Sequence, residues 1–405
     1  MRVSTAYTYS AGLDTLQQRQ TALTEAQEQM TSGKRVAKPS DDPAAMARAE
    51  RALNEESRGE AMQRAIAASR NAMTLTESAL GDAEDLTQTA REALVKAGNG
   101  TYTSSERNAL AAQLRQIRAQ LLSVANQGDG NGSYLFGGQG ANANPFHDGV
   151  DASGNPAVTS SAGGGTPSGS NNEYLPLAVD GNTVWMQVPT GNGVFDTSAD
   201  TTNSGKGWIA GGAVTDPSAL TGSDYAIQFA VDGAGNTTYS ITPSGSGTAL
   251  AGVAYKSGQS ISIDGMNFAV SGSPANGDTF QIKPSTPTGN VFNAIDRALT
   301  ALEDPNANTG QISQAVNSGL RDMDQVLGKF QSARAMVGET LNRLDSVDNR
   351  TSGRILAAQT TRSNAEDLDM VKAVSDFSNK QTSYQAAMQA YSMVQRLSLF
   401  QYLNN

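Results

Sequence analysis

The chain contains no cysteine and only one histidine, His147. Without cysteine there is no disulfide, no thiol nucleophile and no cysteine-ligated zinc. A single histidine also excludes the sites of two or three histidines that hold catalytic zinc. The lack of cysteine suits a protein that works outside the cell without redox chemistry.

Long apolar runs are also missing from the sequence. No stretch approaches the roughly 18 apolar residues of a membrane-spanning helix, so we expect no membrane span. The first residues, Met-Arg-Val-Ser-Thr-Ala-Tyr, show no apolar region of a secretory signal, so we expect that any export uses another route. The net charge of −10 argues against broad binding of nucleic acid.

Arginine and glycine are unevenly distributed along the chain. No arginine occurs between Arg118 and Arg297. Residues 151–285 hold 22 of the 41 glycines, and they carry ten acidic residues against three lysines. This segment therefore differs in composition from the sequence on both sides of it.

Turn signals divide this glycine-rich segment into short β-rich runs, such as 183–188 and 225–231. Asp-Gly and Asn-Gly pairs between such runs are strong hairpin signals. The pairs lie at 180–181, 232–233, 264–265 and 276–277. We predict a small all-β domain at 151–285, inserted into a helical protein.

Helices are predicted on both sides of the insert, because apolar residues recur there at threes, fours and sevens. Asp42 before Pro43 predicts an N-cap and a first helical turn. Thr103 with Glu106 predicts a capping box at the start of a later helix. Helix is predicted again at about 291–302.

A further long helix is predicted at about 310–360. Its apolar series is interrupted by Arg334 and Asp348. Polar residues within such a seam usually fix the register of the helices that pack there.

The first and last 40 or so residues each carry an apolar stripe that has no partner within its own segment. Burial of one such side chain is worth about 1.5–3 kcal/mol, so the two ends are predicted to pair as a coiled coil. We expect this pair to leave a seam open for neighbouring copies; the alternative is two terminal helices docked on their own core. The candidate assembly interface is Tyr9, Leu13, Leu16, Leu23, Met30, Tyr384, Met388, Tyr391, Val394, Leu397 and Phe400.

The predicted fold is α+β and multidomain. It is an elongated rod of long α-helices, with an N- and C-terminal coiled coil and an inserted all-β domain at its tip. The predicted domains are a terminal coiled coil of residues 1–40 and 361–405, a helical rod of 41–150 and 286–360, and the β-rich insert of 151–285.

Side chains that might carry chemistry do not form a site. His147 beside Asp148 is predicted to lie in a loop, and no Gly-x-Ser-x-Gly nucleophile motif accompanies it. Asp129 resembles the start of a calcium loop, but Tyr134 and Gly140 stand where glycine and glutamate are required. We therefore predict no catalytic residue, no metal site and no cofactor, and we do not expect an enzyme.

Several motifs resemble those of a known family. Ser-Asp-Asp-Pro at 40–43 is typical of flagellins broadly, whereas Tyr-Leu-Phe-Gly-Gly at 134–138 followed by Pro-Phe is typical of hook–filament junction proteins. The chain resembles the flagellin superfamily and, within it, the hook-associated protein 3 family; the insert carries no resemblance. The other matching segments are 1–5, 32–36, 342–345 and 397–403.

The resemblance implies a structural component of the bacterial flagellum, an extracellular adaptor at the hook–filament junction on which the flagellin filament assembles. It implies export of the unfolded chain through the flagellar type III apparatus. The implied partners are further copies in a ring or tube, a hook-side junction protein, flagellin or filament-side subunits, and a cytoplasmic export chaperone on the C-terminal helix.

Two other functions stay open at this point. One is a flagellin-type filament subunit. The other is a surface adhesin or sugar-binding module in the β insert, where Trp185 and Trp208 would form a platform for a sugar ring. Tryptophans of this kind more often belong to a core.

Overall fold

A computed structural model describes residues 5–139, 143–151, 154–169 and 173–403, and for residues 5, 6, 8 and 394–403 it describes the backbone alone. The chain divides into two compact units. The first, the terminal unit, is Met1–Arg64 with Ser346–Asn405, and the second, the central unit, is Ala65–Asp345. The domain boundaries predicted near residues 40 and 360 stay a prediction.

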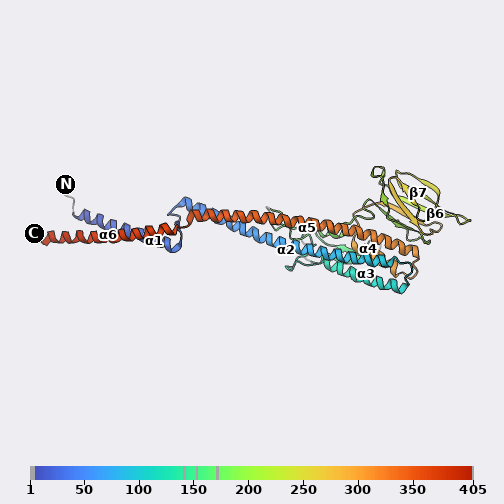
Figure 1. The fold of residues 1–405 in the computed structure, drawn as a ribbon, viewed down its shortest axis with the longest axis horizontal. Helices are drawn as coiled ribbons and strands as arrows, with labels where there is room; N and C mark the ends of the chain where they lie inside the picture. Colours follow the sequence, from blue (N-terminus) through green and yellow to red (C-terminus); the bar gives the residue numbers. More distant parts are fainter. Residues whose placement is uncertain (1–4, 140–142, 152–153, 170–172, 404–405) are drawn as a thin grey trace. The chain divides into compact units, whose positions relative to one another are not determined.

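Long helices precede and follow an inserted β domain along the chain, as predicted (Figure 1). The Asp42 carboxylate accepts hydrogen bonds from the backbone N–H groups of Ala44 and Ala45, at 3.1 and 2.9 Å, and these bonds lower its pKa. The capping box of Thr103 and Glu106 is present. The helices are α1 (Thr5–Ser32), α2 (Pro43–Ala97), α3 (Ser104–Ala125), α4 (Val291–Glu303), α5 (Thr309–Glu366) and α6 (Met370–Leu403).

In the central unit, α2 and α5 are joined across their seam by Arg334. Its guanidinium donates to Glu77 at 2.6 Å and to Glu84 at 2.8 Å, two residues that lie one heptad apart on α2. These bonds raise the pKa of Arg334. Because one arginine spans two carboxylates, a shift of either helix by one turn would break the arrangement, so Arg334 fixes the register.

The β strands form a hairpin and two larger sheets. The hairpin is β1 (Phe146–Val150) with β2 (Pro156–Ser160). The five-stranded sheet has the order β3-β11-β6-β7-β8, and in the other sheet β10 pairs with β4, β5 and β9. The remaining bounds are β3 (Phe195–Ala199), β4 (Trp208–Ile209), β5 (Ala213–Val214), β6 (Tyr225–Val231), β7 (Thr237–Pro243), β8 (Leu250–Ala254), β9 (Ser260–Ile263), β10 (Met266–Ser271) and β11 (Thr279–Pro284).

Two of the four turn signals connect hairpin strands as predicted. The pair at 232–233 joins β6 to β7, and the pair at 264–265 joins β9 to β10. The pair at 276–277 precedes β11, but β11 pairs with β3 and β6 rather than with β10, so the hairpin predicted there is wrong.

The strand predicted at 183–188 is wrong, because these residues include a single π-helical turn, η1 (Asn182–Met186). The Asp180 carboxylate accepts from the N–H groups of Asn182 and Thr183, at 3.0 and 3.3 Å, so this residue begins a helical turn instead of a hairpin. The loop predicted at His147 is also wrong, since His147 lies in β1, exposed and opposite Thr159.

The chain enters and leaves the β domain, residues 195–284, through two adjacent segments. Val188 and Gly289 exchange two backbone hydrogen bonds of 2.9 Å. The Thr190 N–H donates to the Thr286 carbonyl at 3.0 Å, and the Ser285 N–H donates to the Val194 carbonyl at 2.9 Å. The two ends of the domain therefore lie next to each other, as they must in an insertion between packed helices.

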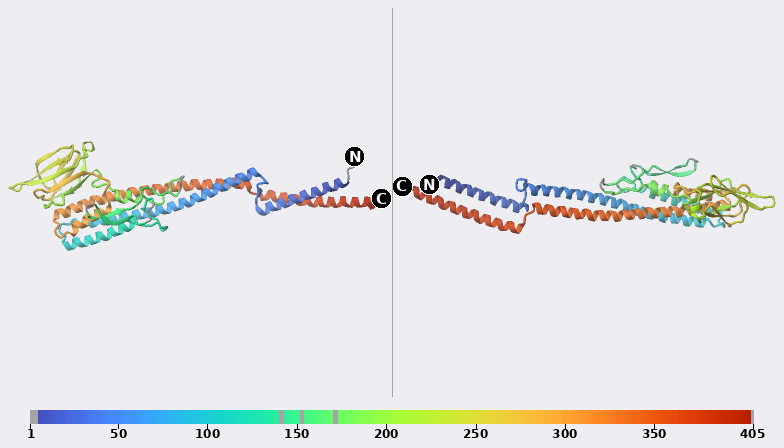
Figure 2. Two further views of the ribbon diagram at one scale, coloured as in Figure 1. Left: turned by 180° about the vertical axis from the view of Figure 1, so that it is seen from behind. Right: turned by 90° about the horizontal axis from the view of Figure 1, so that it is seen from above.

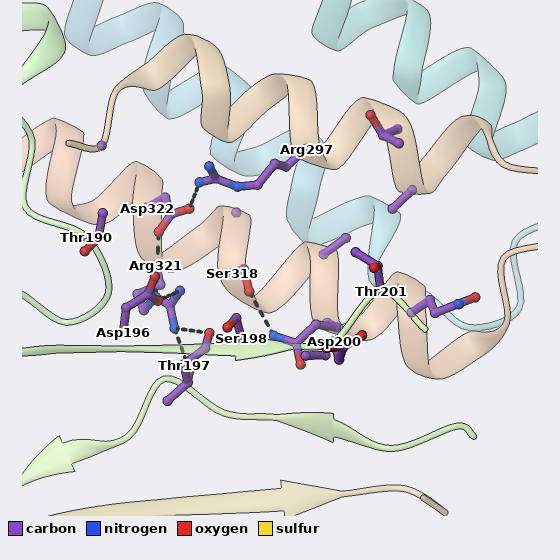
Figure 3. A pocket seen from close by; sticks show the side chains of 18 of the residues that line it. Thr190, Asp196, Thr197, Ser198, Asp200, Thr201, Arg297, Ser318, Arg321 and Asp322 are labelled. Atoms are coloured by element: carbon purple, nitrogen blue, oxygen red, sulfur yellow. Dashed lines mark hydrogen bonds and ion pairs between the residues drawn. The ribbon is translucent and has the colours of Figure 1, made fainter. Parts of the chain in front are cut away.

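The β domain is seated on α4 and α5 through polar contacts around a cavity of about 550 Å³ (Figure 3). Arg321 of α5 donates to Thr197 Oγ1 at 2.7 Å and to the Asp196 carboxylate, while Arg297 pairs with Asp322. Burial raises the pKa of Asp196, an effect that Arg321 opposes. The contact between the β domain and the helices is thus built from charged side chains of opposite sign that pair with one another.

A buried tryptophan lies at the centre of the central unit. Trp185 of η1 has no exposed surface, and its ring lies 5.4 Å from Phe136, 6.3 Å from Phe146, 6.0 Å from Phe292 and 4.8 Å from Phe330. These four rings come from the segment after α3, from β1, from α4 and from α5. One side chain therefore ties the segment before the β domain to the helices.

We predict that the β domain can be excised from residue 191 to residue 285 without unfolding the helices. An Asn-Gly turn joining Thr190 to Thr286 would continue their existing backbone pairing. Circular dichroism at 222 nm should show the helical signal retained. The matched excision of 151–285 also removes Trp185 and should unfold the central unit; equal signals from the two variants would contradict this boundary.

Trp185→Ala should lower the free energy of unfolding by about 3–5 kcal/mol, because it empties the centre of an aromatic cluster. Trp208→Ala is the control, since Trp208 begins β4 and is only partly buried. In urea titrations followed by the helical signal, Trp208→Ala should lower the free energy of unfolding by less than half as much. Similar losses for both variants would exclude the central role of Trp185.

Candidate assembly interface

The described residues contain no group of three acidic or histidine side chains able to hold a metal ion. In the loop that begins at Asp129, the carboxylate accepts hydrogen bonds from the backbone N–H groups of Asn131 and Ser133, at 2.8 and 3.0 Å. Gly140 lies outside the described residues. In the part of the chain that the structure describes, no helix combines the length and apolar character needed to cross a membrane.

The terminal helices α1 and α6 pack side by side in the terminal unit, and the start of α1 and the end of α6 lie at the same end of the pair (Figures 1 and 2). The rings of Tyr9 and Tyr391 lie 5.6 Å apart. Lys34, just after α1, forms a backbone bridge with Asp367, just before α6. The two helices are therefore antiparallel. A Cβ atom added at Gly12 would lie 3.4 Å from the Tyr391 ring, so the helices approach closely there.

The predicted interface residues divide into two groups. Leu16, Leu23, Met30, Tyr384 and Tyr391 are half-buried in the seam between α1 and α6. Tyr9, Leu13 and Met388 are exposed, by 49%, 41% and 49%. Val394, Leu397 and Phe400 belong to the part of α6 whose side chains lie outside the described residues.

Three of the exposed apolar residues, Leu13, Val374 and Met388, share one side of the pair. Leu13 follows Tyr9 by four residues and Met388 follows Tyr384 by four, so each lies on the flank of its helix beside the seam. Because Tyr9 faces Tyr391 in an antiparallel pair, Leu13 lies at the level of Met388. Val374 lies two heptads before Met388 on the same flank and is 51% exposed. We call Tyr9, Leu13, Val374 and Met388 the open face.

Sequence reasoning missed other exposed side chains of this pair, including Met370 at 48% and Met393 at 61%. A signal for Met370 was present, because Met370, Phe377, Tyr384 and Tyr391 form a strict seven-residue series. Exposed apolar patches of this kind mark interaction sites in soluble proteins. Two helices alone do not cover so many apolar side chains.

A paired joint connects α1 and α6 to the helices that follow and precede them. The Arg35 N–H donates to the Glu366 carbonyl at 2.7 Å, and the Leu368 N–H donates to the Gly33 carbonyl at 3.0 Å. The Arg35 guanidinium donates to the Ala365 carbonyl at 2.7 Å. Gly33 has a φ of +71°, which favours glycine. The Ser-Gly-Lys-Arg-Val motif at 32–36 thus builds one strand of this joint.

The Tyr-Leu-Phe-Gly-Gly motif at 134–138 also has a structural role. Leu135 and Phe136 are completely buried, and Phe136 lies edge-on to Trp185. Gly138 has a φ of +61°, and a Cβ atom there would collide with the Gly163 backbone. The motif therefore combines core side chains with a turn that only glycine fits.

Three segments of the chain match known protein regions. Residues 3–141 match the bacterial flagellin N-terminal helical region, and residues 320–403 match the bacterial flagellin C-terminal helical region. Together these two regions cover more than half of the chain. Residues 198–284 match the D2-like domain of flagellar hook-associated protein 1. The expectation that the insert carries no resemblance is therefore wrong.

Relatives resemble the chain over nearly its whole length. It is 26% identical to flagellar hook-associated protein 3 of Salmonella typhimurium over 407 residues, which covers 99% of each chain. The solved structure of flagellar hook-associated protein 3 from Legionella pneumophila is 25% identical, with a TM-score of 0.69, covering 78% of this chain and 98% of that one. The solved structure of FlgL from Xanthomonas campestris is 28% identical, with a TM-score of 0.66, and the match covers 78% of this chain and 99% of that one.

Sequence motifs, structure and relatives agree. The motifs at 32–36, 40–43 and 134–138 all lie within the flagellin N-terminal region, and α6 lies within the flagellin C-terminal region. The relative from Salmonella matches from end to end. The chain belongs to the flagellin family, within its group of hook-associated protein 3, the structural proteins of the hook–filament junction.

Proposed function

We propose that this chain is an adaptor subunit that adds to a hook-side junction protein and presents a surface on which filament subunits assemble. The observation that carries the proposal is the open face. A pair of long helices leaves Tyr9, Leu13, Val374 and Met388 about half exposed, although burial of each would be worth roughly 1.5–3 kcal/mol. Neighbouring helices of the same kind are the simplest cover.

The proposed partners follow from this surface. Further copies of the chain would cover the open face laterally in a ring or tube, and the hook-side and filament-side subunits would cover it at each end. Before assembly, an export chaperone on α6 would shield the same apolar side chains. The partners are proteins throughout, and the proposal includes no nucleic acid and no cofactor.

The full-length match to hook-associated protein 3 favours this function over that of a filament subunit. A sugar platform made by Trp185 and Trp208 has no support, because Trp185 is completely buried within an aromatic cluster. Any sugar-binding role for the β domain would need other residues.

The double variant Leu13→Asp with Met388→Asp should fail to add to hook ends. It places two carboxylates in a surface that assembly buries, so assembly should need at least about 100-fold more protein. Purified variant, mixed with hooks capped by the hook-side junction protein, would be scored by electron microscopy, which removes any effect on export.

The control for this experiment is Gln18→Asp, because Gln18 is exposed and follows Leu16 of the seam by two residues, which turns it about 200° around α1. It adds a carboxylate to the same helix and should assemble normally. Both proteins should keep the thermal unfolding curve of the unchanged chain. Normal addition by the double variant would overturn the open face as the assembly surface.

In the dilute monomer, α1 and α6 should exchange their amide hydrogens fast, whereas the helices around Trp185 exchange slowly. The terminal pair is half-exposed, and isolated helices are marginally stable in water. Hydrogen exchange followed by mass spectrometry provides the measurement. Protection of residues 9–30 equal to that of the Trp185 cluster would show that the pair needs no further partner.

A further inference from the structure

The α2–α5 pair of the terminal unit has two side faces of different character. On one side runs a shallow groove of about 420 Å³. Its floor is made of alanines and its rim of arginines, because small residues at the seam let the two helices approach closely. The lining is Arg48, Arg51, Ala52, Glu55, Arg354, Ala357, Ala358 and Thr361.

The arginines of the rim are available to a partner outside the chain. Arg48 and Arg51 each donate their Nε to a backbone carbonyl of their own helix, at 3.3 and 3.0 Å. Among the ion pairs of the described residues, none joins Arg48, Arg51 or Arg354 to a carboxylate at 4.0 Å or less. The groove therefore carries three arginines against one carboxylate, Glu55, above an apolar floor, so its lining is positive on balance.

The opposite side carries exposed leucines. Ala52 of α2 is buried, and Ile355 of α5 packs against Gly59 of α2, so both face the partner helix. An α-helix turns about 100° per residue, so the residues just before Ala52 and Ile355 lie on one flank of the helix pair and the residues just after them lie on the other. Arg51 and Arg354 precede them and line the groove. Leu53 and Leu356 follow them, so they point away from it.

This second side also carries two glutamates beside Leu53. Leu53 is 40% exposed and Leu356 is 65% exposed. Glu50 lies three residues before Leu53 and Glu60 seven residues after it, so both share its flank of α2. We call Leu53, Leu356, Glu50 and Glu60 the leucine face.

We infer that the arginine-rimmed groove of one copy receives the leucine face of a second copy. The leucine side chains fit above the alanine floor, and Glu50 and Glu60 meet the arginine rim. The inference rests on the proposed function, because it assigns the lateral contact between copies within the junction. The two faces differ and lie on opposite sides of one helix pair. Each copy can therefore bind one neighbour through its groove and another through its leucine face, in a head-to-tail arrangement. Such a contact builds a ring or a helix rather than a closed dimer.

Charge reversal on each face gives a test with an internal rescue. The groove variant is Arg51→Glu with Arg354→Glu, and the face variant is Glu50→Lys with Glu60→Lys. In flagellated cells that lack their own copy of the protein, each variant alone should reduce filament number at least about tenfold, because like charges meet at every contact. Both variants expressed together should restore filaments, since each now meets opposite charge on its neighbours.

The control is Glu92→Lys with Glu339→Lys, which changes net charge by the same amount as the face variant at exposed positions of the central unit. It should give normal filaments. Filaments with either single-face variant alone, or none with the two together while both are exported and folded, would overturn the inference and leave the proposed function standing. If the unchanged chain itself gives no filaments, the proposed function fails and the inference falls with it.

Discussion

The terminal helices expose apolar surface that the chain does not cover by itself. The helices α1 and α6 bury the seam between them, yet Tyr9, Leu13, Val374 and Met388 stay about half exposed along one side. A side chain in this state forgoes about half of the roughly 1.5–3 kcal/mol that full burial would give. In the proposed assembly, neighbouring helices would cover these side chains, and the free energy withheld in the monomer would be recovered there.

The central unit shows the opposite arrangement. Trp185 is surrounded by four phenylalanine rings from different segments, and Arg334 holds α2 and α5 in one register. This unit is complete without a partner and provides a stable base, whereas the paired joint at Gly33 keeps α1 and α6 together. The chain thus combines a well-packed central unit with terminal helices that expose apolar surface, an arrangement that suits the proposed addition of subunits to a growing end.

Much of this was predictable from the sequence, since caps and periodicity act locally. The Asp42 cap, the capping box at Thr103 and the long helices follow from spacing alone. Trp185 shows the limit: Asp-Gly at 180–181 is a hairpin signal, but burial of the indole against the helices favours a π-helical turn. No local pattern reveals that contact, because the helical partners Phe292 and Phe330 lie more than a hundred residues away in the sequence. The half-exposed state of Met388 likewise depends on how far α1 covers α6.

Oxidative footprinting of the methionines measures the central claim directly. Met388 lies on the open face, and its sulfur is oxidised when solvent reaches it. Its oxidation rate therefore measures how far a neighbouring molecule covers this side chain. The account predicts rapid oxidation of Met388 in the dilute monomer and strong protection in isolated hook–filament assemblies, while buried Met73 stays protected in both. Equal oxidation of Met388 in monomer and assembly would show that the open face stays in water, and would contradict the account.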